Sequence, residues 1–550
     1  MQDTEKILAF ARRQAGDLDV ELVVGGPPGR QAGKPAEEDG YSIARKGRKH
    51  VITGSNPRSC LYGVYHVVNK LGRTGEFATP WKVRGLYPCE TLSRHTPEQI
   101  VSFIDRMGKW RMNTFVCYTH YGYHEHAQTI KAECAKRGID ILYYHNTSFW
   151  FGRGWDPRRH FAVDADGVPW TKMLRCETRP CWADPAAEKL ARREIDKFFR
   201  QTLPADHAKL LFAPADGYKH CYCDHCRRLT PMEQWLVMHD AVAAGLRKHA
   251  PGREFHSQVY VHRYRPPADL RSLAEVDRFF FDTHQRARWQ VMGRPHPPLT
   301  FHREFEVDWA ARKTPMNVYF TDRIKEWRDL TGKPITLFEN LMVQGTFSCG
   351  QFNTSILMQD MPVLLAAGVD GMLYEAFETS IQSFADELEH LSRAMWNQRY
   401  RYTSGHVESW SIRRFRKADP TVDPSSEIGA MANLMPSVLS DYPWPAAKRE
   451  IEPIQVEFMK RFARFNRKPS ARAAAAVVDL VMPRKDRFDS LWIGFWTLRR
   501  LFREKGIAGL SAADRRFLSY EKLWDFMEEN PPGRKTTERR IASVRAKLKA

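Results

Sequence analysis

Four carboxylates stand where short apolar segments of the sequence end, a placement suited to acid–base chemistry. They are Asp216, Asp282, Glu339 and Glu375. A carboxylate at the tip of a buried strand is costly unless that tip opens into a site. Cleavage of a glycosidic bond needs two carboxyl groups across the reacting carbon, and we predict Asp216 as the acid and Glu339 as the base or nucleophile. The alternative for each carboxylate is a helix N-cap or an ion pair with a loop arginine.

Other polar and aromatic residues gather at the same predicted strand ends and are suited to lining a sugar pocket. In addition to Asp282 and Glu375, the predicted substrate contacts are His120, His145, Asn146, Trp150, His262 and His284. With Phe151 and Trp155, Trp150 would supply flat apolar walls for a pyranose ring. The alternatives are structural histidines and aromatic residues that anchor buried loops.

Three cysteines form a compact cluster directly after Asp216, and their spacing is that of metal ligands. Cys221, Cys223 and Cys226 are thiols that would hold a structural Zn²⁺. Three ligands are one short of a closed site, so His220 or a distant cysteine such as Cys176 or Cys181 must complete it. The alternatives are a disulfide with one free thiol, or unlinked thiols. A catalytic metal is not expected, because the ligands follow the strand tip rather than converge on the pocket.

Apolar runs and amphipathic segments alternate through the middle of the chain and position these residues. The sequence predicts eight strands, at Val83–Leu86, Thr114–Thr119, Asp140–His145, Lys209–Ala215, Phe255–Val261, Arg278–Asp282, Ile335–Phe338 and Gly371–Tyr374. Helices are predicted between most of them, at Pro97–Trp110, Gln128–Arg137, Ala186–Arg200, Met232–His249 and Ser355–Ala367, with a last one at Ser383–Trp396. This alternation predicts an α/β fold of the (β/α)8 barrel type, whose sites lie at the carboxyl ends of the strands.

Two further regions flank the predicted barrel. Residues 1–80 read as a small α/β domain with a strand, a hairpin around Lys46-Gly47 and a helix that ends near Gly72. Residues 81–400 hold the barrel, within which Thr283–Asp322 is irregular and reads as a long loop or an insertion. Residues 401–550 read as a helical domain.

Composition restricts the class of protein and of partner. The 550 residues are 43% hydrophobic and 27% charged, as in globular proteins, and no apolar run approaches the length of about 18 that spans a membrane. Ten cysteines are too few for a disulfide scaffold. The net charge of +20 reflects dispersed lysines and arginines, which favours a solvated basic surface or an acidic glycan over nucleic acid. Secretion or a periplasmic location with the leader removed is the expected localisation, and a cytoplasmic location is the alternative.

Three segments resemble glycoside hydrolases of the β-N-acetylhexosaminidase and α-glucuronidase type. GYSIARKGRKHVITGSNPRSCLYGVYHVVNKLG resembles their small domain, RGLYPCETLSRHTPEQIVSFIDRMGKWRMNTFVCYTH their first barrel strand, helix and second strand, and GVDGMLYEAFE their closing strand. The resemblance implies that Arg84 binds sugar hydroxyls bidentately and that Glu375 accepts hydrogen bonds from others. Asp216-Gly217 stands where hexosaminidases carry Asp-Glu, so the expected acid of that family is missing.

Taken together, the residues and the resemblance predict a glycoside hydrolase. We expect an exo-acting enzyme that needs no catalytic cofactor, with a glycan, possibly an acidic one, as its substrate. The alternative is a glycan-binding protein on a hydrolase scaffold that has lost its acid. Neither nucleic acid nor membrane is expected as a partner, and the sequence does not indicate an oligomeric state.

Overall fold

The computed structural model describes most of the chain in two compact units. The described residues are 4–25, 39–71, 74–88, 96–118, 123–146, 155–156, 160–163, 166–168, 181–182, 184–203, 209–214, 221–260, 263–283, 286, 291–295, 315–340, 354–375, 385–397, 457–458, 460–484, 488–519 and 533–549. The first unit comprises Met1–Asn340, Ile356–Ala376 and Ser392–Tyr400, and the second Leu341–Ser355, Phe377–Leu391 and Arg401–Ala550.

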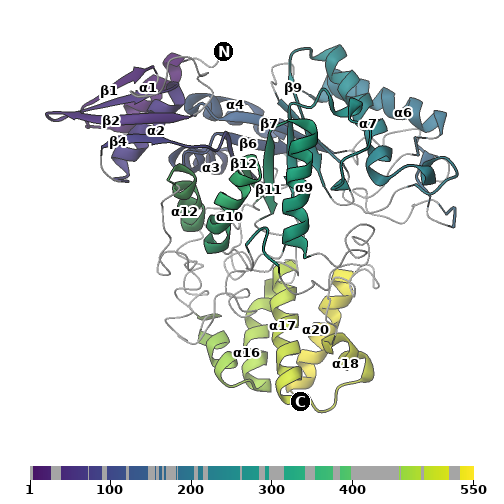
Figure 1. Ribbon diagram of the computed structural model, residues 1–550. Coiled ribbons are helices and arrows are strands. Elements are labelled where there is room, and N and C mark those ends of the chain that lie inside the picture. Colours follow the sequence, from purple (N-terminus) through teal and green to yellow (C-terminus); the bar gives the residue numbers. More distant parts are fainter. Residues whose placement is uncertain are drawn as a thin grey trace. The chain divides into compact units, whose positions relative to one another are not determined.

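The first unit begins with a four-stranded sheet of order β1-β3-β2-β4, in which only β1 and β3 are parallel (Figure 1). Its elements are α1 (Thr4–Ala15), β1 (Val20–Val24), β2 (Gly40–Lys46), β3 (Lys49–Gly54), α2 (Pro57–Val68) and β4 (Gly75–Ala78). Gly47 has a positive φ of 64° in the turn between β2 and β3, which glycine adopts without strain. Asn56 caps α2 by accepting from the Ser59 backbone N–H at 2.8 Å. Helix α1 and strand β4 were not predicted from the sequence.

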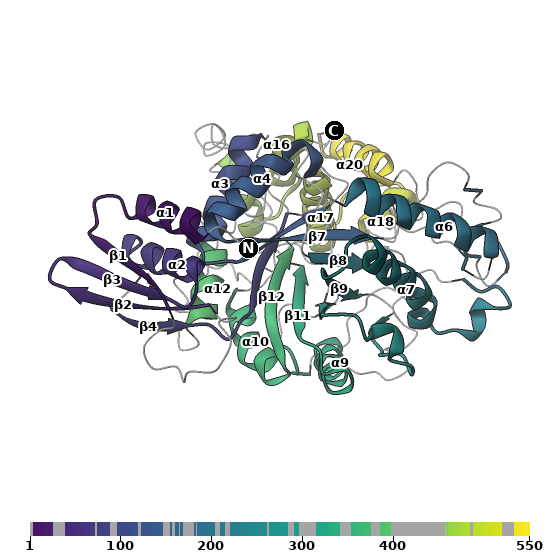
Figure 2. The same ribbon diagram turned by 90° about the horizontal axis from the view of Figure 1, so that it is seen from above.

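Eight parallel strands then close into a barrel of order β10-β11-β12-β5-β6-β7-β8-β9 (Figure 2). They are β5 (Val83–Tyr87), β6 (Thr114–Tyr118), β7 (Asp140–Asn146), β8 (Lys209–Ala213), β9 (Glu254–Val259), β10 (Arg278–Asp282), β11 (Ile335–Asn340) and β12 (Val369–Glu375). The predicted (β/α)8 fold is confirmed, and each predicted strand overlaps an observed one.

Helices follow the strands, and local capping signals set where several of them begin. They are α3 (Pro97–Lys109), α4 (Tyr123–Arg137), α6 (Pro185–Lys197), α7 (Pro231–His249), α9 (Met316–Thr331), α10 (Thr354–Ala366) and α12 (Ala385–Trp396). Thr96 with Gln99, and Thr230 with Glu233, form reciprocal capping boxes ahead of α3 and α7. Helix α9 begins inside the interval that the sequence analysis read as irregular.

Helices also form the carboxyl-terminal part of the second unit. The described ones are α16 (Ala471–Val481), α17 (Phe488–Lys505), α18 (Ala512–Ser519) and α20 (Gly533–Lys549). Their shared core consists of buried apolar side chains: Val478, Met482, Phe495, Leu498, Leu510, Phe517, Leu518, Ile541 and Val544. Across the described residues, every helix is too short or too polar to cross a membrane.

Candidate active site

Aromatic side chains fill the inside of the barrel near the carboxyl ends of its strands. Tyr87, Tyr118, Tyr144 and Phe338 belong to four different strands, and all are buried. The ring centroid of Tyr87 lies 5.1 Å from that of Tyr144 and 5.7 Å from that of Phe338, and Tyr118 and Tyr144 are 4.9 Å apart. Contacts across the barrel show that these side chains point inward. We refer to these four residues as the aromatic floor.

The carboxylate of Asp282 belongs to this inner face. Its Cα pairs with that of Phe338, and neighbours in register share a face of the sheet. Gln258 of β9 donates from Nε2 to Asp282 Oδ2 at 3.0 Å, while Tyr144 of the aromatic floor donates to Gln258 Oε1 at 3.1 Å. This chain of hydrogen bonds runs from β7 through β9 to β10, fixes the orientation of Gln258 and thereby positions Asp282.

Glu375 and Asn146 also lie on the inner face, at the last residues of their strands. Glu375 is in register with Tyr87, and Asn146 is two residues beyond Tyr144, so alternation turns both inward. Asn146 is buried, whereas Glu375 is partly exposed. Only β11 separates the strands of Asp282 and Glu375, which places their backbones about 10 Å apart across the sheet. Two carboxylates therefore stand on one side of the barrel interior.

Glu339 faces the other way, so its predicted role in a catalytic pair is not supported by its position. It follows the inward-pointing Phe338 in β11, and alternation turns it outward. Its Oε2 accepts from Thr283 Oγ1 at 3.1 Å and from Arg286 Nη1 at 3.3 Å, and the side chain is 1% exposed. Arg286 also contacts Asp360 of α10, with Nη2 2.5 Å from Oδ2. Glu339 is thus part of a buried charge cluster outside the barrel sheet.

Burial dominates the electrostatics of this outer cluster. The pKa of Asp360 is raised to about 6 by burial, although Arg286 and the Met292 backbone N–H oppose the shift. Burial also raises the pKa of Tyr374, as does the nearby Glu339 carboxylate. An acidic group with a raised pKa is typical of catalytic sites, but here it lies between a strand and its covering helix.

The implied contact of Arg84 with sugar hydroxyls is not supported by its position, because the side chain is at the opposite end of its strand from the carboxylates. Arg84 is the second residue of β5, three residues before Tyr87. Its Nη2 lies 2.5 Å from Asp39 Oδ2, Nη1 donates to the Trp81 carbonyl, and Nε donates to the Arg111 carbonyl at 3.0 Å. The guanidinium is 1% exposed. Arg84 therefore links the small sheet to the barrel instead of meeting a ligand.

A residue of the last barrel helix completes this junction. The Arg84 guanidinium lies over the ring of Trp396, with Cζ 5.1 Å from the centroid. Trp396 also packs against Tyr41 and Tyr62 of the small sheet and its helix, at centroid distances of 5.3 and 5.6 Å. Thr79 donates to the Met395 carbonyl at 2.7 Å.

Most of the histidine and tryptophan residues that were predicted to contact substrate lie outside the described residues. His145 is described, but it pairs in register with the outward-facing Phe212 and stacks on Phe198 at 4.1 Å, so it packs among helices and not in the barrel. Five predicted site residues lie outside the described residues: Asp216, His120, Trp150, His262 and His284.

The aromatic floor and Gln258 were not among the residues predicted from the sequence. Their signal is the period-two alternation of a strand: Gln258 shares a face with His256 on β9, as Tyr144 shares one with Asn146 on β7. Marking strand tips alone does not separate inward from outward residues. Counting back from a known inward residue would have favoured Asp282 over Glu339.

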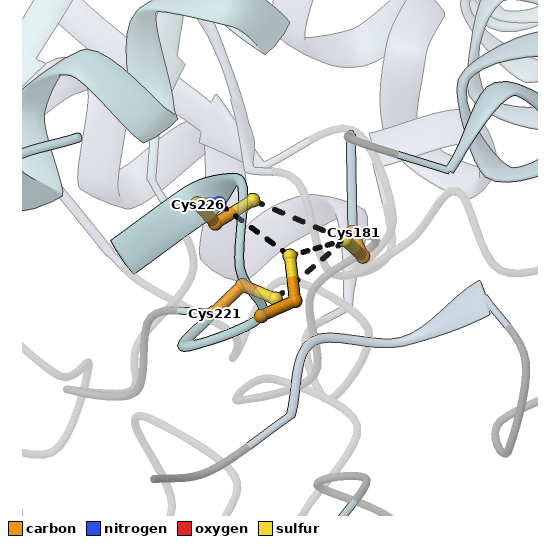
Figure 3. A group of neighbouring side chains, drawn as sticks. Cys181, Cys221 and Cys226 are labelled. Carbon is orange, nitrogen blue, oxygen red and sulfur yellow. Dashed lines mark hydrogen bonds between the residues drawn. The ribbon is translucent and has the colours of Figure 1, made fainter. Parts of the chain in front are cut away.

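The cysteine cluster is described together with a fourth thiol (Figure 3). Cys181 Sγ lies 3.6 Å from that of Cys221, 3.7 Å from Cys223 and 3.9 Å from Cys226. All four sulfur atoms lie within 4.8 Å of one another, and none forms a disulfide. The predicted disulfide alternative is thus not what the structure contains. Cys176 and His220, the other proposed fourth ligands, lie outside the described residues.

No protein-family model and no curated protein matches the chain. Among solved structures it is similar to a GH138 enzyme targeting pectin rhamnogalacturonan II, with 11% identity, a TM-score of 0.48, and coverage of 99% of this chain and 68% of that one. It is also similar to the chitobiase of Flavobacterium johnsoniae, with 11% identity, a TM-score of 0.47, and coverage of 98% and 94%. The β-N-acetylhexosaminidase of Bacteroides fragilis follows, with 12% identity, a TM-score of 0.43, and coverage of 70% and 81%.

Proposed function

We propose that the protein is a glycoside hydrolase whose reaction takes place at the carboxyl ends of the barrel strands. The observation that carries this proposal is the pair of inward-facing carboxylates, Asp282 and Glu375, beside the aromatic floor. Glycosidases work with two carboxyl groups around the anomeric carbon, and sugars pack their apolar faces on aromatic rings. Metal-free acid–base chemistry of this kind needs no cofactor.

The two carboxylates differ in setting, which suggests a division of roles. Asp282 is buried and accepts a hydrogen bond from Gln258, so it is a positioned carboxylate suited to act as base or nucleophile. Glu375 is partly exposed and is suited to meet the sugar first, as acid or as hydroxyl acceptor. Asp216 follows β8, which lies four strands from β12 in the ring, and it stays the predicted proton donor from the sequence.

An acidic glycan attacked from one end is the substrate class that we favour. The net charge of +20 would attract uronate-bearing chains. The exo mode rests on the resemblance of the first 80 residues to the small domain of exo-acting hexosaminidases. A panel of aryl glycosides that pairs each neutral sugar with its uronide tests both the reaction and the charge preference.

The mechanistic test compares variants of the inner carboxylates with an exposed acid. We expect Asp282→Asn and Glu375→Gln each to lower kcat/KM by about 10²–10⁴-fold, the usual contribution of a positioned acid or base. Asp329→Asn, on the exposed surface of α9, is the matched control and should leave kcat/KM unchanged. Asp216→Asn belongs in the same series. The variant that removes the acid should spare activated aryl leaving groups relative to natural glycans.

The rival function is glycan binding without cleavage, and the glycine after Asp216 favours it. If the wild-type protein turns over no member of the panel but binds an oligosaccharide by calorimetry, the binding function stands and the hydrolase is refuted. If wild-type turnover is found and both inner-carboxylate variants keep it, the assignment of Asp282 and Glu375 is wrong even though the protein is an enzyme.

A further inference from the structure

The four thiols of Cys181, Cys221, Cys223 and Cys226 come together from two separate connections of the barrel. Cys181 lies in the connection between β7 and α6, and the other three lie in the connection between β8 and α7. Figure 3 shows the labelled side chains of Cys181, Cys221 and Cys226 directed toward a common centre. From this convergence we propose a structural zinc site with four cysteine ligands.

The sulfur separations agree with a tetrahedral metal centre. A Zn–S bond of about 2.3 Å places the sulfur atoms of a regular tetrahedron about 3.8 Å apart. The separations from Cys181 are 3.6, 3.7 and 3.9 Å. A disulfide would bring two sulfur atoms to about 2.05 Å and leave the other two displaced. All four sulfur atoms lie within 4.8 Å of one another, so a single ion could contact each of them.

Hydrogen bonds hold the ligand loop in this shape before any ion binds. Gln234 of α7 accepts from the Cys221 backbone N–H at 2.9 Å, and its Nε2 donates to the carbonyls of Cys221 at 3.1 Å and Cys226 at 2.8 Å. The Cys226 backbone N–H points at Cys223 Sγ, 3.4 Å away. A backbone donor to a sulfur ligand stabilises the thiolate that binds the metal. These hydrogen bonds indicate a preorganised site and not a chance proximity of thiols.

Burial and the preference of zinc for thiolate ligands favour a bound zinc ion over four thiols without a metal. Three of the four cysteines are buried, and Cys223 is partly buried. Zinc prefers thiolate ligands and takes four of them in closed structural sites. A closed site has no open position for water, so this ion would not take part in the reaction proposed above. The inference stands on the cysteines alone and does not depend on that function.

The position of the site gives the ion a structural purpose. Strands β7 and β8 are neighbours in the barrel, and both connections leave from their carboxyl ends. An ion bound by Cys181 and Cys221 cross-links these two long connections. Asp216 belongs to the second of them, so the same ion would restrict the segment that carries the predicted acid.

The first measurement is the metal content of the full chain purified without added metal. We expect one zinc per chain by plasma mass spectrometry, and after replacement by Co²⁺ the intense visible absorption of tetrahedral cobalt thiolate. Intact mass after alkylation under denaturing, non-reducing conditions should show every cysteine alkylated. Iron in place of zinc, a pair of cysteines protected as a disulfide, or free thiols that bind neither zinc nor cobalt would each overturn the assignment.

Two matched variants separate ligation from the general cost of changing a buried cysteine. Cys181→Ala should lower the zinc content below a tenth of the wild-type value, whereas Cys134→Ala, a buried thiol on α4, should leave it unchanged. If Cys181→Ala does not fold, the wild-type protein serves instead: compared with denaturant alone, denaturant with a chelator should release zinc and expose four further reactive thiols. Equal zinc contents in both variants, or zinc release without new reactive thiols, would refute ligation by these cysteines.

Discussion

The buried carboxylate of Asp39 is predicted to be the residue on which the junction between the small sheet and the barrel depends. Its Oδ2 lies 2.5 Å from Arg84 Nη2, and its Oδ1 lies 3.2 Å from Arg58 Nη2. Asn56 and Asn113 donate to the same carboxylate at 2.9 and 3.3 Å. Burial raises the pKa of Asp39, but the two guanidinium groups outweigh this effect and hold the pKa well below its usual value.

The perturbation is Asp39→Asn, which removes the charge and keeps the shape. At about 3 Å and an effective dielectric constant of about 20, each charge pair is worth about 5–6 kcal/mol before desolvation, and desolvation cancels much of this. Removing one partner of a buried pair leaves the other charge uncompensated and costs about 3–5 kcal/mol. Arg84 is 1% exposed and cannot turn to solvent, so we expect a loss in that range.

Hydrogen exchange read by mass spectrometry is the suitable assay, because it reports the opening of β2 and β5 separately from the helical unit. Glu21→Gln is the control: Glu21 is half exposed and pairs with Lys49 at 3.7 Å, so its loss should cost under about 1 kcal/mol. The wild-type contribution should be complete above about pH 5 and decline below it, because the folded pKa of Asp39 is depressed. A loss equal to that of the control, or a raised KM without destabilisation, would refute this account of Arg84.

Two further predictions concern the barrel. Tyr144→Phe removes the donor to Gln258, so kcat should fall about 5-fold, the effect of one hydrogen bond of about 1 kcal/mol; an unchanged kcat would exclude a positioning role. Asp360 has a folded pKa near 6, above its unfolded value, so it makes the wild-type protein lose up to about 3 kcal/mol of stability as pH rises from 4 to 6. In Asp360→Asn the midpoint of urea unfolding should depend less on pH over this window. An unchanged pH dependence would contradict the burial of that charge beside Arg286.

Regular alternation made the barrel predictable from the sequence. Apolar runs such as Leu210–Phe212 report burial on both faces of a strand, and that information is local. Helix starts were equally local, since Thr96 and Pro97 define the beginning of α3 without any tertiary contact. Helix α9 escaped prediction because it lacks such a signal: Pro315 precedes it with no side-chain cap.

The active-site assignments depended on information that is not local. Whether a carboxylate at a strand end points inward is decided by register, and a shift of one residue exchanges the two faces, as for Asp282 and Glu339. The family resemblance implied a sugar-binding role for Arg84. Its observed partner, Asp39, lies outside the barrel, so the sequence around Arg84 does not reveal this contact. Cys181 could only be named as one candidate ligand, because 40 residues separate it from Cys221.

The packing of the Trp396 ring at the junction has a consequence for how this chain folds during synthesis. The core of the small amino-terminal sheet includes Trp396 among its buried residues, and 316 residues separate Thr79 from its partner Met395. At about 5–20 residues per second, a ribosome needs about 15–60 s to cover that distance. During this interval Tyr41 and Tyr62 lack the ring that covers them, so the nascent sheet exposes an aromatic surface. The small sheet is therefore synthesised long before it can complete its packing, and it offers an aromatic surface to chaperones during that interval.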